Sequence, residues 1–240
     1  MLSKNQLKLV RSLDRKKCRQ QSGLFVAEGP KVVADLLRAG FEAATIFSVS
    51  ERPGAQAVTD EELRRLSFLQ HPQDVLALFR IPTPPAVAPT NADKLSLALD
   101  GIQDPGNLGT IIRIADWFGI STVYCSPDTA DIYSPKVVQA TMGSLAHVAV
   151  VYCSLPHLLS SASCPVYGTL LDGDDIYCSS LSRGGILVMG NEGRGLSPEV
   201  RALVSHRLLI PRYGTSFESA ESLNVAVATA VCCAEFRRRL

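Results

Sequence analysis

The stretch DGIQDPGNLGTIIR, residues 100–113, joins an apolar strand to a helix through a tight turn made by glycines and a proline. Asn107 stands where the cap of that helix is expected. Arg113 lies off the apolar stripe, yet Ile114 and Trp117 make its side of the helix apolar too. We therefore expect Arg113 to face a cleft or a partner subunit, with an exposed arginine and a simple cap asparagine as the alternative.

From residue 93 to the end, predicted strands alternate with predicted helices. Ile186–Met189 is an uninterrupted apolar run, which is typical of a strand buried on both faces of a parallel sheet. The pattern predicts an α/β domain with a mainly parallel sheet. Ligands of such sheets bind beyond the carboxyl ends of the strands, so the loops that follow the strands are the candidate site.

Two further loops carry unusual residues. The first, GNEGRG at 190–195, is rich in glycine, but its glycine order is not that of a dinucleotide-binding loop. The second is LIPRYG at 209–214, which precedes a helix expected over 221–239. Ser222 and Asn224 would then lie in the first turn of that helix, either as ligand-binding groups or as cap residues.

The first 81 residues read as a small α/β unit, and residues 82–92 read as a linker. The linker is predicted because four prolines fall within residues 81–89, which excludes a central strand or a helix interior. The expected domains are therefore 1–81, with 93–240 after the linker.

Charge and cysteine content narrow the class of protein. The 240 residues carry a net charge of +1, but residues 1–40 carry +6, in part from Lys16, Lys17 and Arg19. This asymmetry indicates either an arm that binds a polyanion or a solvated helix face. The seven cysteines form no C-x-x-C pair, so we expect no metal site and no disulfide framework. No stretch has the ~18 apolar residues of a membrane span, and we expect a cytoplasmic protein.

Taken in order, DPGNLGxxxR, VMGNEGxGL and IP followed by SLNVAxA resemble the three motifs of the SpoU (TrmH) family of RNA ribose 2′-O-methyltransferases, in the SPOUT superfamily. The resemblance covers roughly residues 93–240. Residues 1–80 more loosely resemble the small ribosomal-protein-like substrate-binding domain that many members carry, most closely at FVAEGPK, residues 25–31.

This resemblance implies a knotted α/β catalytic domain, S-adenosylmethionine as methyl donor, and a homodimer in which Arg113 of one subunit completes the site of the other. The substrate would be structured RNA, with ribosomal RNA favoured over transfer RNA, and no metal or membrane would take part. The implied catalytic residues are Asn107, Arg113, Glu192, Ser222 and Asn224. The implied cofactor-binding residues are Thr169, Leu170, Gly190, Asn191, Ile210, Pro211 and Leu223.

The implied roles follow from ordinary chemistry. Because arginine keeps its proton, we expect Arg113 to clamp a phosphate and stabilise charge rather than act as a base. Asn107 would orient Arg113 or the ribose, and Glu192 would hold Arg113 or its own loop. Ser222 and Asn224 would shape the pocket. Two features depart from the family: Arg212 follows Ile-Pro where methionine is common, and Thr215–Ala220 lengthens the third loop.

Two other functions compete. A catalytically silent RNA-binding or ribosome-associated factor would have the same fold, but it would need only basic and aromatic surface and not this set of polar residues. An NAD-dependent oxidoreductase is disfavoured by the order of the glycines. Stabilisation by S-adenosylhomocysteine and not by NAD would separate the enzyme from the oxidoreductase.

Overall fold

The structure is a computed structural model that describes residues 2–83, 87, 92–214 and 222–239. The chain divides into two compact units. The first comprises Met1–Thr83 together with Asp131–His147, and the second comprises Pro84–Ala130 together with Val148–Leu240. Most of the expected linker at 82–92, and the expected insertion Thr215–Ala220, lie outside the described residues.

The first unit is a four-stranded sheet with helices packed on it. Its strands run in the order β1-β4-β2-β3, and β4 pairs antiparallel with both β1 and β2. The strands are β1 (Leu24–Glu28), β2 (Ala43–Ser48), β3 (Gln56–Ala57) and β4 (Val75–Arg80). The helices are α1 (Lys4–Ser12), α2 (Lys16–Ser22), α3 (Pro30–Arg38) and α4 (Asp60–Leu66). A buried apolar cluster that includes Val10, Val26, Phe47 and Leu66 joins α1 and α4 to the sheet.

A segment distant in sequence completes this unit. Residues 131–147 contain α6 (Pro135–Ala140) and the 3-10 turn η1 (Ser144–Ala146). The Tyr133 ring lies 4.9 Å from the Phe25 ring on β1, and the Arg19 guanidinium pairs with the Asp131 carboxylate at 2.6 Å. The first unit therefore includes residues from both halves of the sequence.

The second unit confirms the predicted parallel sheet. Its six strands run in the order β10-β8-β9-β5-β6-β7, and every pair is parallel. The strands are β5 (Leu95–Asp100), β6 (Thr122–Cys125), β7 (Ala149–Tyr152), β8 (Val166–Asp175), β9 (Gly185–Gly190) and β10 (His206–Leu209). The helices are α5 (Pro105–Trp117), α7 (Leu155–Ser160), α8 (Pro198–Arg201) and α9 (Val225–Arg238).

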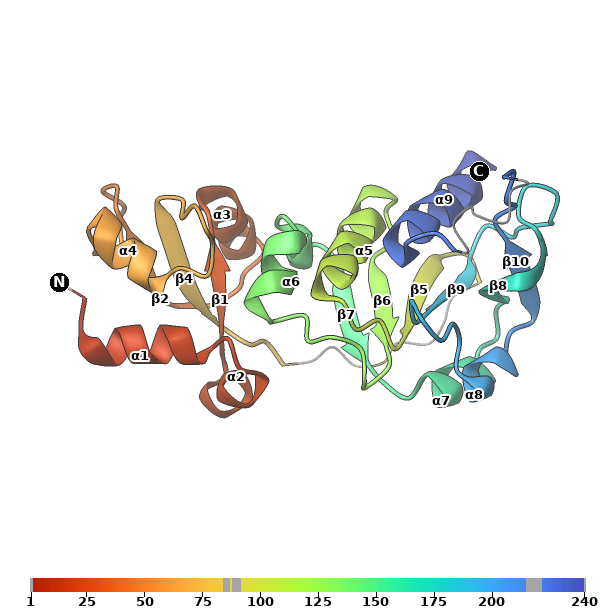
Figure 1. Cartoon of the computed structure of the whole chain (residues 1–240), viewed down its shortest axis with the longest axis horizontal. Helices are drawn as coiled ribbons and strands as arrows, with labels where there is room; N and C mark the ends of the chain where they lie inside the picture. Colours follow the sequence, from red (N-terminus) through yellow and green to blue (C-terminus); the bar gives the residue numbers. More distant parts are fainter. Residues whose placement is uncertain (1, 84–86, 88–91, 215–221, 240) are drawn as a thin grey trace. The chain divides into compact units, whose positions relative to one another are not determined.

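Helices α5 and α9 lie side by side in the second unit and run in the same direction (Figure 1). Their N-terminal ends are joined by the side chains of Asn107 and Asn224. At the other end, Arg237 Nε donates to the Phe118 carbonyl oxygen at 2.8 Å. This pair of helices fixes the start of α9 beside the start of α5, where the candidate site lies.

Candidate active site

The loop after β9 is held closed by one asparagine. The backbones of Asn191 and Gly195 exchange two hydrogen bonds of 2.9 Å. The Asn191 side-chain oxygen accepts from the backbone N–H groups of Gly193 and Arg194, and its nitrogen donates to the Gly101 carbonyl at 2.7 Å. Asn191 therefore fixes the loop to the end of the neighbouring strand β5.

Gly190 begins this loop because the backbone folds back on itself there. A Cβ atom at Gly190 would lie 2.4 Å from the carbonyl carbon of Gly195, so any side chain would displace backbone. At Gly193 a Cβ atom would meet only the Asn191 side-chain oxygen, at an ordinary 3.7 Å. Glycine is therefore required more strictly at Gly190, where β9 ends, than at Gly193 within the loop.

Asn107 does not cap α5, and this corrects the sequence-based expectation. Asp104 is the N-cap, and its carboxylate accepts from the backbone N–H of Asn107 at 2.8 Å. Pro105 then occupies the first helical position, as is common after a cap. The Asp-Pro pair was the signal for this cap, and it leaves the side chain of Asn107 available for other partners.

The side chain of Asn107 joins the three motif segments. Its Nδ2 donates to Glu192 Oε1 at 2.8 Å, and its Oδ1 accepts from Asn224 Nδ2 at 2.9 Å. An amide is suited to this position because it donates and accepts at once. The start of α5, the glycine loop and the start of α9 therefore meet at one residue.

Asn224 is the N-cap of α9 rather than a residue of its first turn. Its Oδ1 accepts from the backbone N–H groups of Ala226 and Val227, at 2.9 and 3.3 Å. Ser222 and Leu223 precede the helix and are exposed, and 51% of the Leu223 surface is accessible. The Asn224 side chain thus serves both as the helix cap and as a residue of the candidate site, the two roles expected from the sequence.

Arg113 is not part of this hydrogen-bonded group within one chain. It is exposed on α5, and among the described residues no hydrogen bond or ion pair holds it, so the expected contacts with Asn107 and Glu192 are not present. One turn further on, Trp117 is 85% exposed, and on α9 Val227 is 51% exposed. Arg113 therefore lies on an open face with large exposed apolar side chains.

Of the expected cofactor-binding residues, Gly190 and Asn191 lie at the end of β9, whereas Thr169 and Leu170 lie within β8, which continues to Asp175. Gly168 pairs with Val188, so Thr169 and Leu170 follow on β8 beside the end of β9. Ile210 and Pro211 come directly after β10 and are half-buried. Together with Leu223 these groups offer apolar side chains and uncharged backbone, which fit the adenine and ribose of a nucleoside cofactor.

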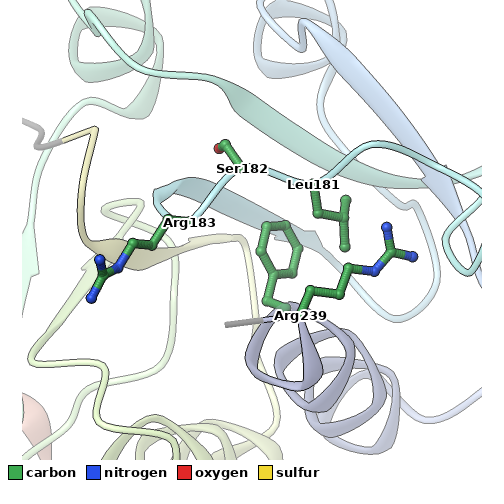
Figure 2. A pocket seen from close by; sticks show the side chains of 5 residues that line it. Leu181, Ser182, Arg183 and Arg239 are labelled. Atoms are coloured by element: carbon green, nitrogen blue, oxygen red, sulfur yellow. The ribbon is translucent and has the colours of Figure 1, made fainter.

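A separate cavity of about 360 Å³ lies near the end of α9, lined by Leu181, Ser182, Arg183, Phe236 and Arg239. Figure 2 shows that the Arg183 and Arg239 side chains point in opposite directions. Arg239 already pairs with Glu235 and donates to the carbonyl oxygens of residues 176 and 177. The cavity therefore offers no converging anion site.

Within the described residues no group of three His, Cys, Asp or Glu side chains is placed to hold a metal ion. None of the helices in that part of the chain is long and apolar enough to cross a membrane.

Two family models match the chain, one on each side of the expected linker, and the one after the linker includes residues 131–147, which pack in the first unit. The model of the SpoU rRNA Methylase family matches residues 94–234, and that of the MRM3-like substrate binding domain matches residues 4–77. The chain is 32% identical to the 23S rRNA (guanosine(2553)-2′-O)-methyltransferase RlmP of Bacillus subtilis, covering 95% of each.

Solved structures agree with this result. A TrmH-family protein from Porphyromonas gingivalis is 42% identical, with a TM-score of 0.88 and full coverage of both chains. The AdoMet-bound rRNA methyltransferase from Sinorhizobium meliloti is 31% identical, with a TM-score of 0.89 and coverage of 100% of this chain and 97% of that one. The fold thus defines an α/β methyltransferase of the SPOUT type. The chain belongs to the SpoU rRNA Methylase family, which confirms the resemblance inferred from the three motifs.

Proposed function

We propose that this chain methylates a ribose 2′-hydroxyl of ribosomal RNA with S-adenosylmethionine as the methyl donor. One observation supports this above others: Asn107 joins Glu192 and Asn224, so the three segments that define the family meet in one site. The Bacillus subtilis relative is a 23S rRNA 2′-O-methyltransferase, and the Sinorhizobium meliloti structure contains AdoMet.

The cofactor-binding residues in this proposal are Thr169, Leu170, Gly190, Asn191, Ile210, Pro211 and Leu223. The cofactor supplies an electrophilic methyl group on a sulfonium. The glycine loop allows a close approach to backbone groups because its first residue has no side chain. The exposed side chain of Leu223 provides an apolar surface against which an adenine ring is buried.

The catalytic residues supply position and charge. Methyl transfer needs the 2′-oxygen in line with the methyl carbon, and positioning alone is worth effective molarities of ~10⁵ M or more. Arg113 holds the phosphate next to the target ribose, because a guanidinium matches phosphate geometry and keeps its proton. Asn107 and Glu192 fix the pocket wall, and Ser222 and Asn224 shape its floor.

The active form in this proposal is a homodimer. Arg113 lies on the same exposed stripe of α5 as Trp117, and Val227 is exposed on the neighbouring helix α9. Exposed apolar patches of this kind mark interfaces, and a two-fold axis brings the same patch of two subunits together. Arg113 of one subunit then reaches the Asn107 site of the other, in keeping with its lack of a hydrogen bond or ion pair within the described part of its own chain.

The first unit delivers the RNA, in agreement with its match to a substrate-binding domain. Arg15, Lys16 and Lys17 are exposed at the start of α2 and suit phosphate contacts. Arg19 does not, because it is 2% exposed and pairs with Asp131. We assign the activity to the cytoplasm, since several of the relatives act on bacterial ribosomal RNA.

The test is methyl transfer in vitro from labelled S-adenosylmethionine to unmodified ribosomal RNA, followed by nucleoside mass spectrometry. One new 2′-O-methyl nucleoside is expected in ribosomal RNA and none in transfer RNA. Binding of RNA without any methylated product would instead support the silent binding factor.

A further inference from the structure

The first unit contains a hollow of about 280 Å³ that the methyl-transfer site does not use. Its lining residues include Val26 and Glu28 of β1, Phe68 after α4, and Lys136 and Gln139 of α6. The volume lies just below the ~300–1,000 Å³ of sites for drug-sized ligands. The hollow therefore suits one flat ring system, of one or two fused rings, better than a larger molecule.

Glu28 places a carboxylate in the lining of this hollow. Only 5% of Glu28 is exposed. Its Oε1 accepts from the Phe68 backbone N–H at 2.8 Å, and its Oε2 accepts from the Ser67 hydroxyl. An ionised carboxylate has about four acceptor positions, so two remain for a ligand that donates two hydrogen bonds. None of the ion pairs found among the described residues includes Glu28.

Two side chains of α6 at the hollow also have spare capacity. Gln139 is half-buried, and its amide has no hydrogen-bond partner in the described part of the chain. Lys136 is exposed, and in the same described part no carboxylate pairs with it. Phe68 lines the hollow, and the Arg11 guanidinium lies 4.9 Å from its ring centre, which adds positive charge beside the aromatic ring. The hollow thus combines two acceptors, one amide, one aromatic ring and a nearby cation.

We propose that this hollow binds a guanine base of the substrate RNA. The Watson–Crick edge of guanine presents one acceptor, O6, and two adjacent donors, N1–H and N2–H. Glu28 accepts from the two donors, and the Gln139 amide donates to O6. Phe68 packs against the ring, as aromatic side chains do with unstacked RNA bases, and Lys136 contacts a flanking phosphate.

The other three bases fit less well. Uracil has a single N–H between two carbonyl oxygens, and those oxygens would be repelled by the carboxylate. Adenine and cytosine each place a ring-nitrogen acceptor beside their amino group, so only one of the two Glu28 positions is used. A buried acceptor left unpaired is costly, and this is the source of the selectivity. The proposal rests on the proposed function only in taking RNA as the ligand.

The experiment measures binding of short single-stranded RNAs to the full-length protein by fluorescence anisotropy. One RNA contains a single guanosine, and two others carry inosine or 2-aminopurine at that position. Inosine lacks only the N2 amino group, whereas 2-aminopurine lacks both O6 and the N1–H donor. We expect the guanosine RNA to bind about tenfold more tightly than either analogue. Equal binding of all three RNAs would overturn the proposal.

Variants assign the contacts without disturbing Glu28, whose replacement would also unbalance the Ser67–Phe68 turn. Gln139→Leu should weaken binding of the guanosine and inosine RNAs, which carry O6, and leave binding of the 2-aminopurine RNA unchanged. Lys136→Ala should weaken all three RNAs equally, and the matched control Gln21→Leu, on the exposed face of α2, should change nothing. A Gln139→Leu protein that binds the guanosine RNA as tightly as the wild type does, or that loses as much affinity for the 2-aminopurine RNA as for the guanosine RNA, would contradict the assignment. Failure of the methyl-transfer assay would leave these binding results unaffected, so the two proposals fail separately.

Discussion

At the scale of single residues, the Asn107 side chain connects the segments of the site because a neighbouring residue caps the helix in its place. Asp104 takes over the capping of α5, and the amide of Asn107 then donates to Glu192 and accepts from Asn224. A side-chain amide performs both functions with two separate atoms. The site therefore depends on the capping residue Asp104, which leaves both atoms of the Asn107 amide available.

Arg113→Ala should reduce kcat for methyl transfer by about 100-fold or more, because one charge-stabilising donor is typically worth that much. Arg113 is exposed and has no partner among the described residues, so stability should change by less than ~0.5 kcal/mol. Binding of S-adenosylmethionine, measured by calorimetry, should be retained. Arg64→Ala on the exposed side of α4 is the matched control. Normal turnover by the Arg113 variant would remove it from the catalytic set.

The sequence predicted which residues meet better than it predicted how they meet. Asn107, Glu192 and Asn224 were all expected in the site, and the structure joins them. Their contacts were not predictable, because a side-chain hydrogen bond between residues 107 and 192 depends on tertiary packing and leaves no local pattern. Among the described residues Arg113 contacts neither Asn107 nor Glu192, which was one of two expected arrangements. The other, in which Arg113 serves the partner subunit's site, stays a prediction.

At the scale of elements, the loop after β9 is shaped by a close approach of its own backbone. Gly190→Ala would bring a Cβ atom within 2.4 Å of Gly195, so the loop must move. We expect a loss of about 1–3 kcal/mol in the free energy of unfolding and weaker binding of S-adenosylmethionine. Gly193→Ala is the control in the same loop, because its Cβ atom meets only an ordinary contact. Thermal melts with and without cofactor measure both effects, and equal behaviour of the two variants would contradict this account of the loop.

At the C-terminal end of α9, the Glu235 carboxylate accepts hydrogen bonds from two arginines, and we call this group the carboxylate clamp. Glu235 is 4% exposed and accepts from Arg238 and Arg239, and these hydrogen bonds lower its pKa from 4.5 to about 2. A lowered folded-state pKa stabilises the fold above the unfolded value, and this stability is lost as pH falls from about 4.5 towards 2. Glu235→Gln should therefore cost about 1–2 kcal/mol at pH 7, since both arginines are partly solvated.

The measurement for Glu235 is urea unfolding at several pH values. The difference between wild type and Glu235→Gln should shrink as pH falls below about 4.5. A difference that stays constant over this pH range would exclude the clamp as its cause.

The order of elements in the second unit followed from apolar periodicity, because Leu95–Asp100 and Gly185–Gly190 are buried strands with little competing signal. The start of α9 could not be predicted in this way. The helix begins at Val225 and not at residue 221, because Asn224 caps it. The packing of residues 131–147 onto β1 also could not be predicted. It depends on the Arg19–Asp131 pair, whose members are 112 residues apart.

At the scale of the whole molecule, the proposed dimer makes catalysis a property of two chains. Arg113→Ala and Asn107→Ala homodimers should each be inactive, yet a mixture that exchanges subunits should regain activity. If Arg113 acts in the partner's site, each mixed dimer has one site with both wild-type residues, and about a quarter of all sites become active. If Arg113 acts within its own chain, every site in the mixture remains defective. Methyl transfer before and after exchange distinguishes the two cases.

The basic residues of α2 divide into two groups with different consequences for RNA binding. Arg15, Lys16 and Lys17 are exposed, and replacing all three with glutamine removes up to three phosphate contacts. The slope of log affinity against log salt should then fall by up to ~2–3, equally for target and unrelated RNA, because phosphate contacts carry no sequence information. Stability and S-adenosylmethionine binding should be unchanged, since these side chains make no contact that the fold needs.

Arg19 provides the matched contrast because it lies on the same helix but is buried. It pairs with Asp131 and donates to the carbonyl oxygens of Leu13 and Asp14. Arg19→Gln should cost about 3–5 kcal/mol, as removal of one partner from a buried ion pair does, and should leave the salt slope of the remaining folded protein unaltered. Filter binding at several salt concentrations and urea unfolding of both variants test this division. An unchanged slope in the triple variant would mean that RNA binds the molecule through another surface and that the charge of α2 serves only to keep it solvated.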